Sequence, residues 1–228
     1  MNRIILLETS TALCSAALAV DGKIVSYREE DGRVHASRLA PMVQEILEEN
    51  KLKVSGCDAV CVSMGPGSFT GLRVGVSTAK GLCFGAGIPL LAVGSLETLV
   101  WQARENGLPE GCRYIVPMID ARRMEVYTAV YSADGEIVVP VAPKVLDESS
   151  YASELSGGKV LFIGDGAEKA SGVIKSPNAS FVQACPSARD MAKPALKAFE
   201  AKDWKDVAYF EPFYLKDFIP TTSKHKIF

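Results

Sequence analysis

The order of strand-like and helix-like segments occurs twice along this chain, and this repeat constrains the fold more than any other feature. One short apolar run ends at Glu8, and a similar run ends at Asp120. The turn dipeptide Asp21-Gly22 has a counterpart in Asp134-Gly135. Both spacings are close to half of the 228 residues, which indicates two structural copies rather than a solenoid of many short repeats.

The first copy predicts a three-stranded antiparallel meander followed by alternating helices and strands. Asp-Gly between two β-rich runs favours a tight hairpin, because both central residues of that turn adopt positive φ. Apolar residues at helical spacing predict a helix over residues 36–50. Strands are predicted over residues 4–7, 14–20, 23–28, 59–64 and 89–93, and further helices from residue 70 to residue 84 and from residue 95.

The second copy repeats this order and completes a known architecture. Its predicted strands include residues 114–119, 125–131 and 160–163. A β-β-β-α-β-α-β unit present twice is typical of the actin-like, ribonuclease H-like α/β fold, with a mixed five-stranded sheet and flanking helices in each copy. We expect subdomains over residues 1–107 and 108–228, joined by a linker within residues 106–113, with the last segment packing back on the first subdomain.

The stretch GPGSFTGLR, residues 65–73, raises the question of whether the chain binds a nucleotide. A Walker A loop requires Gly-Lys-Ser/Thr, but Leu72-Arg73 follow the last glycine, and a dinucleotide fingerprint needs a glycine where Thr70 stands. Two interpretations remain: a strand-to-helix turn capped by Ser68 or Thr70, or an anion site at a helix N-terminus. The candidate anion contacts are Gly65, Gly67, Ser68, Thr70 and Gly71. In the second copy, Gly164-Asp165-Gly166 follows a strand in the same way.

Two carboxylates at strand ends, Glu8 and Asp120, are expected to face the cleft between the copies. Paired carboxylates can bind Mg²⁺ or act as acid and base, but Arg122 and Arg123 could equally form ion pairs with Asp120. In actin-like ATPases the phosphates usually rest against the first hairpin, beside a glycine and an aspartate. Residues 7–12 contain no glycine and carry Glu8 in place of the aspartate, which predicts no ATPase activity for the isolated chain.

The other residues predict neither a catalytic side chain nor a metal site. Of the two histidines, His35 has no second histidine at ligand spacing, and His225 lies in a tail, residues 221–228, that we expect to be mobile. Six cysteines without a C-x-x-C pair predict buried free thiols in the cytoplasm, and no apolar stretch is long enough to span a membrane. A net charge of −2 indicates that another component would hold most of any bound RNA.

The predicted helix over residues 70–84 carries more apolar surface than a single contact with a sheet requires. Small or apolar residues cover far more of its circumference than the about 100° typical of a surface helix. Gly71, Gly75 and Ala79 lie four residues apart and form a groove that the helix over residues 36–50 could enter. Either this helix pair offers a shared apolar face to a second protein, or it packs on the chain's own sheet.

Several motifs resemble those of the bacterial TsaB (YeaZ) family of tRNA threonylcarbamoyladenosine biosynthesis proteins. They are I-L-L-E-T-S-T, H-A-S-R-L-A-P, G-P-G-S-F-T-G-L-R-V-G, D-A-R-R-M-E-V-Y and E-P-F-Y-L-K, in the expected order over nearly the whole chain. The resemblance implies an actin-like paralogue of the catalytic subunit TsaD. It implies a non-catalytic scaffold that works with TsaD and TsaE when threonylcarbamoyl is transferred to the adenosine beside the tRNA anticodon.

The resemblance also implies a heterodimer with TsaD through the first two helices, and a homodimer of the isolated protein. The implied interface corresponds to Leu39, Met42, Val43, Ile46, Leu72, Gly75, Val76, Ala79 and Cys83. It further implies tRNA contact through the complex alone, and ATP or ADP only at an assembled interface. Glu8 departs from the family's usual aspartate.

Two other functions stay open at this point. The first is a glycoprotease-like peptidase that acts on TsaD, with His35 as its best candidate residue. The second is a small actin-like ATPase or sugar kinase, which would bind Mg-ATP as an isolated chain.

Overall fold

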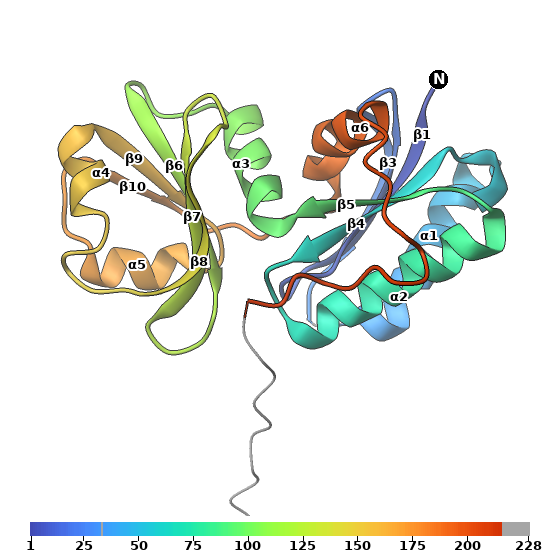
Figure 1. Cartoon of the computed structure of the whole chain (residues 1–228), viewed down its shortest axis with the longest axis horizontal. Helices are drawn as coiled ribbons and strands as arrows, with labels where there is room; N and C mark the ends of the chain where they lie inside the picture. The colour runs from blue at the N-terminus through green and yellow to red at the C-terminus, as the bar shows by residue number, and fades with distance from the viewer. Residues whose placement is uncertain (33, 216–228) are drawn as a thin grey trace, which may run out of the picture.

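Two five-stranded sheets form the centres of two lobes in the computed structural model, which describes residues 1–32 and 34–215 (Figure 1). The strand order is β3-β2-β1-β4-β5 in the first sheet and β10-β9-β6-β7-β8 in the second. The first sheet contains β1 (Arg3–Glu8), β2 (Cys14–Val20), β3 (Lys23–Glu30), β4 (Ala59–Gly65) and β5 (Leu90–Gly94). The second contains β6 (Cys112–Asp120), β7 (Glu125–Ser132), β8 (Ile137–Val145), β9 (Lys159–Ile163) and β10 (Ala179–Val182).

The two sheets share one mixed topology. β1 pairs antiparallel with β2 and parallel with β4, and β6 pairs antiparallel with β7 and parallel with β9. This confirms the tandem actin-like fold predicted from the repeat. The hairpins differ in detail, since Asp21 (φ 48°) and Gly22 (φ 74°) form a two-residue turn, whereas residues 133–136 form a longer one in which Gly135 has φ 87°.

One face of each sheet is covered by helices from its own half of the chain. α1 (His35–Glu49) and α2 (Phe69–Ala86) pack on the first sheet, with the one-turn helix η1 (Val54–Gly56) between them in sequence. α4 (Ala152–Gly157) and α5 (Ala167–Val173) flank the second sheet, where Phe162 is fully buried.

The opposite faces are covered by helices that the two halves exchange. α3 (Ser95–Asn106) follows β5 of the first sheet, yet its Leu99 packs with Ile115 of the second. The short helix η2 (Ala188–Met191) and α6 (Ala192–Glu200) follow the second sheet, yet Ala195 packs with Leu6 of the first. The boundary predicted at residues 107 and 108 follows the sequence repeat, while α3 and α6 each lie on the other lobe's sheet (Figure 1).

After α6 the chain runs along the first lobe and across α2 (Figure 1). The Lys205 amide donates to the carbonyl of Leu90 at 2.8 Å, and the Phe213 amide donates to the carbonyl of Met64 at 2.8 Å. Between these anchors, Nζ of Lys80 donates to the carbonyls of Ala208 and Phe210 at 2.9 and 3.2 Å. Lys80 of α2 therefore binds this C-terminal segment.

All six cysteines are free, and Cys14, Cys57, Cys61 and Cys83 are buried. Within the described ranges, no helix has the combined length and apolar character that crossing a membrane requires. His225 and the rest of the predicted tail, residues 221–228, lie outside the described residues.

Candidate functional site on the first lobe

The glycine loop that precedes α2 packs closely against the loop between β1 and β2. Ser68 is the N-cap of α2, and its Oγ accepts a hydrogen bond from the Gly71 amide at 3.3 Å. The Ser68 amide donates to the carbonyl oxygen of Ser10 at 2.7 Å. A Cβ atom added at Gly67 or Gly71 would lie under 3.0 Å from the carbonyl oxygen of Ser10 or Thr9, respectively. Both glycines are therefore required by close backbone approach.

Two of the backbone N–H groups of this loop are already bonded within the chain, which disfavours a phosphate there. An anion at a helix N-terminus needs free backbone N–H groups with space in front of them. Here the Ser68 amide already has a carbonyl acceptor, and the Ser68 side chain takes the Gly71 amide. The carbonyl oxygens of Thr9 and Ser10, which would repel a phosphate, point toward the same glycines.

Glu8 lies beneath this loop and is fully buried. Its Oε1 accepts a hydrogen bond from the Ser10 amide at 2.6 Å. Burial raises the pKa of Glu8, and the hydrogen bonds from Ser10 and Ser63 oppose that rise only in part. A buried carboxyl whose pKa is raised, and which forms no ion pair with the described residues, favours its neutral form, in which it can hold the β1–β2 loop through Ser10.

Asp120, the counterpart of Glu8 in the second lobe, is exposed and has different neighbours. Its Oδ2 lies 3.0 Å from Nζ of Lys169, and its backbone amide donates to Oδ1 of Asp165 at 2.8 Å. The ion pair suggested for Arg122 or Arg123 is thus formed by Lys169, while Arg122 contributes its backbone amide to Asp120 at 2.6 Å. Asp120 does not act as the partner of Glu8 in these interactions.

The sequence patterns did not identify Asp165 as a candidate site residue, although it lies between the two glycines that follow β9. Burial raises its pKa to about 6, and the carboxylate of Asp120 adds to that rise. Its position matched the glycine loop of the first copy, so the repeat itself carried the signal that could have identified it.

The peptidase interpretation receives no support from His35. Its side chain is buried, and Nε2 has no hydrogen-bond partner among the described residues. Across residues 1–32 and 34–215, no group of three or more His, Cys, Asp or Glu side chains is arranged to hold a metal ion.

The nine residues of the implied partner interface lie inside the first lobe. All nine are buried in the single chain: Leu39, Met42, Val43, Ile46, Leu72, Gly75, Val76, Ala79 and Cys83. Most of them form one core with strands β1, β2 and β4. Any docking surface on this helix pair must therefore consist mainly of their exposed neighbours.

The small-residue stripe also has a different neighbour from the one expected. A Cβ atom at Gly71 or Gly75 would meet Thr9 first, not α1. At Gly71 and Gly75 the expected neighbour is therefore replaced by the β1–β2 loop, whereas Ala79 shares one core with the α1 residues Leu39 and Met42.

The exposed side of the helix pair forms a shallow apolar groove of about 350 Å³. Ala40, Gln44 and Leu47 line it from α1, and Thr78 and Leu82 line it from α2. Gly81 and Gly85 lie on the same side of α2, are exposed, and have no atom within 4 Å of an added Cβ. We call these seven residues the docking face.

The two exposed glycines are not explained by packing within the chain. Glycine in a helix interior costs about 1 kcal/mol relative to alanine, and close approach of another backbone is the usual compensation. Gly67 and Gly71 have that compensation inside the lobe, whereas Gly81 and Gly85 lack it among the described residues. One turn away, the Phe84 side chain is 86% exposed. The groove, the two glycines and Phe84 together leave this part of the helix pair open on the single chain.

Comparison with known proteins identifies the family of the chain. A family model described as "TsaD: tRNA N6-adenosine threonylcarbamoyltransferase" matches residues 28–217. The tRNA threonylcarbamoyladenosine biosynthesis protein TsaB of Escherichia coli (strain K12) is 33% identical over 229 aligned residues, which cover 94% of this chain and 95% of that protein. The chain belongs to the TsaB family.

Solved structures support membership of the TsaB family and its fold. YeaZ from Pseudomonas aeruginosa has a TM-score of 0.78 and 30% identity, covering 94% of this chain and all of that one (100%). Component A of (R)-2-hydroxyglutaryl-CoA dehydratase from Acidaminococcus fermentans has a TM-score of 0.52 at 11% identity, covering 89% of this chain and 100% of that one. The second likeness shows a shared fold alone.

Proposed function

We propose that this chain is a non-catalytic partner subunit in the formation of threonylcarbamoyladenosine beside the tRNA anticodon. The observation that carries the proposal is the docking face, an apolar groove bordered by two exposed helical glycines. Membership of a family named for this modification supplies the pathway. The glycine loop is packed against the carbonyl groups of Thr9 and Ser10 in the β1–β2 loop, which supports a binding role rather than a catalytic one.

The proposed partner is the TsaD-type catalytic subunit of the same organism. The match of the TsaD model to residues 28–217 means that the two chains share one fold, so they can meet through equivalent helix pairs. In this proposal TsaE joins the pair, tRNA is contacted through the complex, and ATP or ADP binds only where subunits meet. The isolated chain uses the same face to form a homodimer. Its six free thiols fit a cytoplasmic site of action.

A substitution on the docking face tests the proposal. Gly81→Arg places a charge where the partner backbone would approach, and we expect the affinity for the TsaD-type subunit to fall about 100-fold, because an unpaired buried charge costs about 3 kcal/mol. Gly172→Arg is the matched control, since Gly172 is also a helical glycine with nothing within 4 Å of an added Cβ. Ala79→Arg is unsuitable, because Ala79 is fully buried and the variant would not fold.

Calorimetry with the purified subunit gives the affinities, and circular dichroism verifies that both variants are folded. Equal binding by Gly81→Arg and the wild-type chain would refute the proposed interface. Modification of tRNA is then measured with the complete set of subunits, where omission of this chain should abolish the product. Turnover of ATP by this chain alone would favour the ATPase alternative instead. Cleavage of the TsaD-type subunit by this chain alone, lost in His35→Ala, would favour the peptidase alternative.

A further inference from the structure

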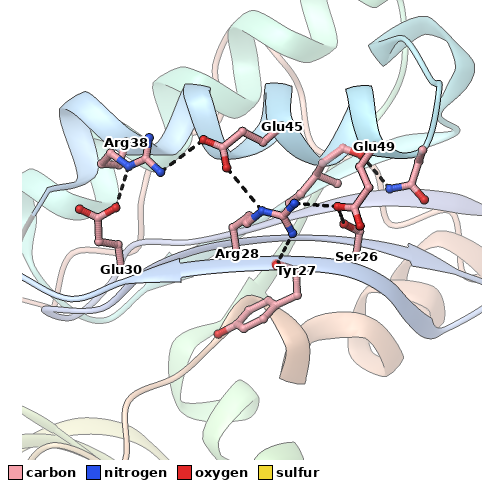
Figure 2. A network of polar contacts seen from close by, with 9 residues as sticks. Ser26, Tyr27, Arg28, Glu30, Arg38, Glu45 and Glu49 are labelled. Carbon is pink, nitrogen blue, oxygen red and sulfur yellow. Dashed lines mark hydrogen bonds and ion pairs between the residues drawn. The ribbon is translucent and has the colours of Figure 1, made fainter.

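An ion-pair network joins β3 to α1, the helix that lines one side of the docking face (Figure 2). Nε of Arg28 lies 3.4 Å from Glu45, and its Nη2 lies 2.7 Å from Glu49. Nε of Arg38 lies 2.7 Å from Glu30, and its Nη2 lies 3.3 Å from Glu45. Glu45 therefore bridges two arginines, one from the strand and one from its own helix.

The sequence of α1 makes this support necessary. The helix has no side-chain N-cap, contains Pro41, and has no basic residue in its last turn. Its C-terminal half instead carries Glu45, Glu48 and Glu49, close to the end where the helix dipole is negative. Without cations from outside the helix, these carboxylates would repel one another and the helix end.

The network also determines which side of α1 is charged. Gln44 and Glu48 line the groove, whereas Glu45 and Glu49 are directed toward β3 (Figure 2). Ser26 contributes to the same arrangement, since its hydroxyl donates to Glu49 at 2.8 Å. The β3 side of α1 thus holds Glu45 and Glu49, while Glu48 and Lys53 are the charged residues that line the otherwise mainly apolar groove.

Alternate residues of β3 serve different helices. Ser26, Arg28 and Glu30 face α1, whereas Glu29 pairs with Arg189 of η2 at 3.3 Å on the other side of the sheet. The second pair has a similar exposure but does not touch the docking face. Arg189 therefore offers a matched control for Arg28.

We propose that Arg28 and Arg38 are positioning residues that hold Glu45 and Glu49 away from the docking face, so that Glu48 and Lys53 remain its only charged borders among the described residues and the partner it receives is a mainly apolar, small-residue helix surface of the TsaD-type subunit. This inference rests on the proposed function, because it concerns the same surface. The charged heads of long side chains can swing over adjacent apolar surface when they have no partner. Freed glutamates would then have to lose their hydration when the partner helix docks.

The test combines substitution with a salt titration of binding to the TsaD-type subunit. For Arg28→Ala we expect about fivefold weaker binding at low salt, equivalent to about 1 kcal/mol for an exposed charge. At about 1 M NaCl, where the screening length is about 3 Å, the difference from the wild-type chain should disappear. Glu45→Gln with Glu49→Gln in the Arg28→Ala background should restore binding at low salt.

A purely structural role for Arg28 predicts another pattern. If Arg28→Ala only loosens α1, its weaker binding will persist at high salt and will not be restored by the two glutamines; that pattern would overturn the inference. Arg189→Ala should bind like the wild-type chain at every salt concentration. Unchanged binding by Arg28→Ala would also overturn it, whereas the absence of any binding by the wild-type chain would refute the proposed function itself.

Discussion

Replacing single glycines of α2 by alanine should change stability in opposite directions along one helix. At Gly81 an added Cβ has no atom within 4 Å, so Gly81→Ala should gain the helix-propensity difference of about 1 kcal/mol. At Gly71 the Cβ would lie under 3.0 Å from the carbonyl oxygen of Thr9, a backbone atom in a buried loop. Overpacking of this kind costs about 3 kcal/mol, which leaves Gly71→Ala about 2 kcal/mol less stable than the wild-type chain.

Thermal unfolding of the isolated chain measures both effects. For a chain of 228 residues, each kcal/mol shifts the Tm by about 2–4 °C. We therefore expect a rise of about 2–4 °C for Gly81→Ala and a fall of about 4–8 °C for Gly71→Ala. Gly172→Ala, in α5, is a second open glycine and should resemble Gly81→Ala.

The sign of the Gly71 result decides whether the reasoning holds. A Tm for Gly71→Ala equal to or above that of the wild-type chain would show that the β1–β2 loop does not press on α2. The glycine loop would then have space for an anion in front of its backbone N–H groups. A fall for Gly81→Ala would show that α2 already has a neighbour at that residue.

Two further predictions concern charged groups. Burial raises the pKa of Glu8 in the folded chain above its unfolded value of 4.5. The neutral carboxyl therefore contributes its full stabilisation below pH 4.5, and this contribution is lost as the pH rises through the folded pKa. Glu8→Gln should therefore gain stability relative to the wild-type chain as melts move from pH 4 to pH 8; a constant difference would refute this. Lys169→Ala should lower stability by about 2 kcal/mol, since its Nζ binds Asp120 and the carbonyls of Arg123 and Glu125. Hydrogen exchange measures this effect: the backbone amides of residues 122–125 should exchange faster in Lys169→Ala than in the wild-type chain, and at the wild-type rate in the control Lys175→Ala.

The fold could be predicted from the sequence because its evidence is local and occurs twice. Alternating apolar runs, Asp-Gly turns and the helical spacing of residues 36–50 each define an element on their own. Ser68 was one of two candidate caps, and its hydrogen bond from the Gly71 amide agrees with that choice. A pattern repeated at half the chain length then indicated that this succession of elements occurs twice along the chain.

The candidate site could be predicted only in part, because burial depends on tertiary packing. Apolar residues such as Met42 and Ala79 satisfy a core and an interface equally well, so helical spacing cannot separate the two. Gly71 and Gly81 have the same chemistry in one helix, yet Thr9 reaches only the first. The pairing of Asp120 with Lys169 likewise depends on α5, which is far from Asp120 in sequence.

The exchange of α3 and α6 makes each lobe depend on the other half of the polypeptide. A fragment that stops at the linker would keep α3 with no sheet to cover, and it would leave Leu6 and its neighbours open to water. Although the sequence repeats, neither copy is a self-sufficient module. Once a duplicated ancestor had acquired this exchange, its two halves could no longer be encoded by separate genes and fold as independent proteins.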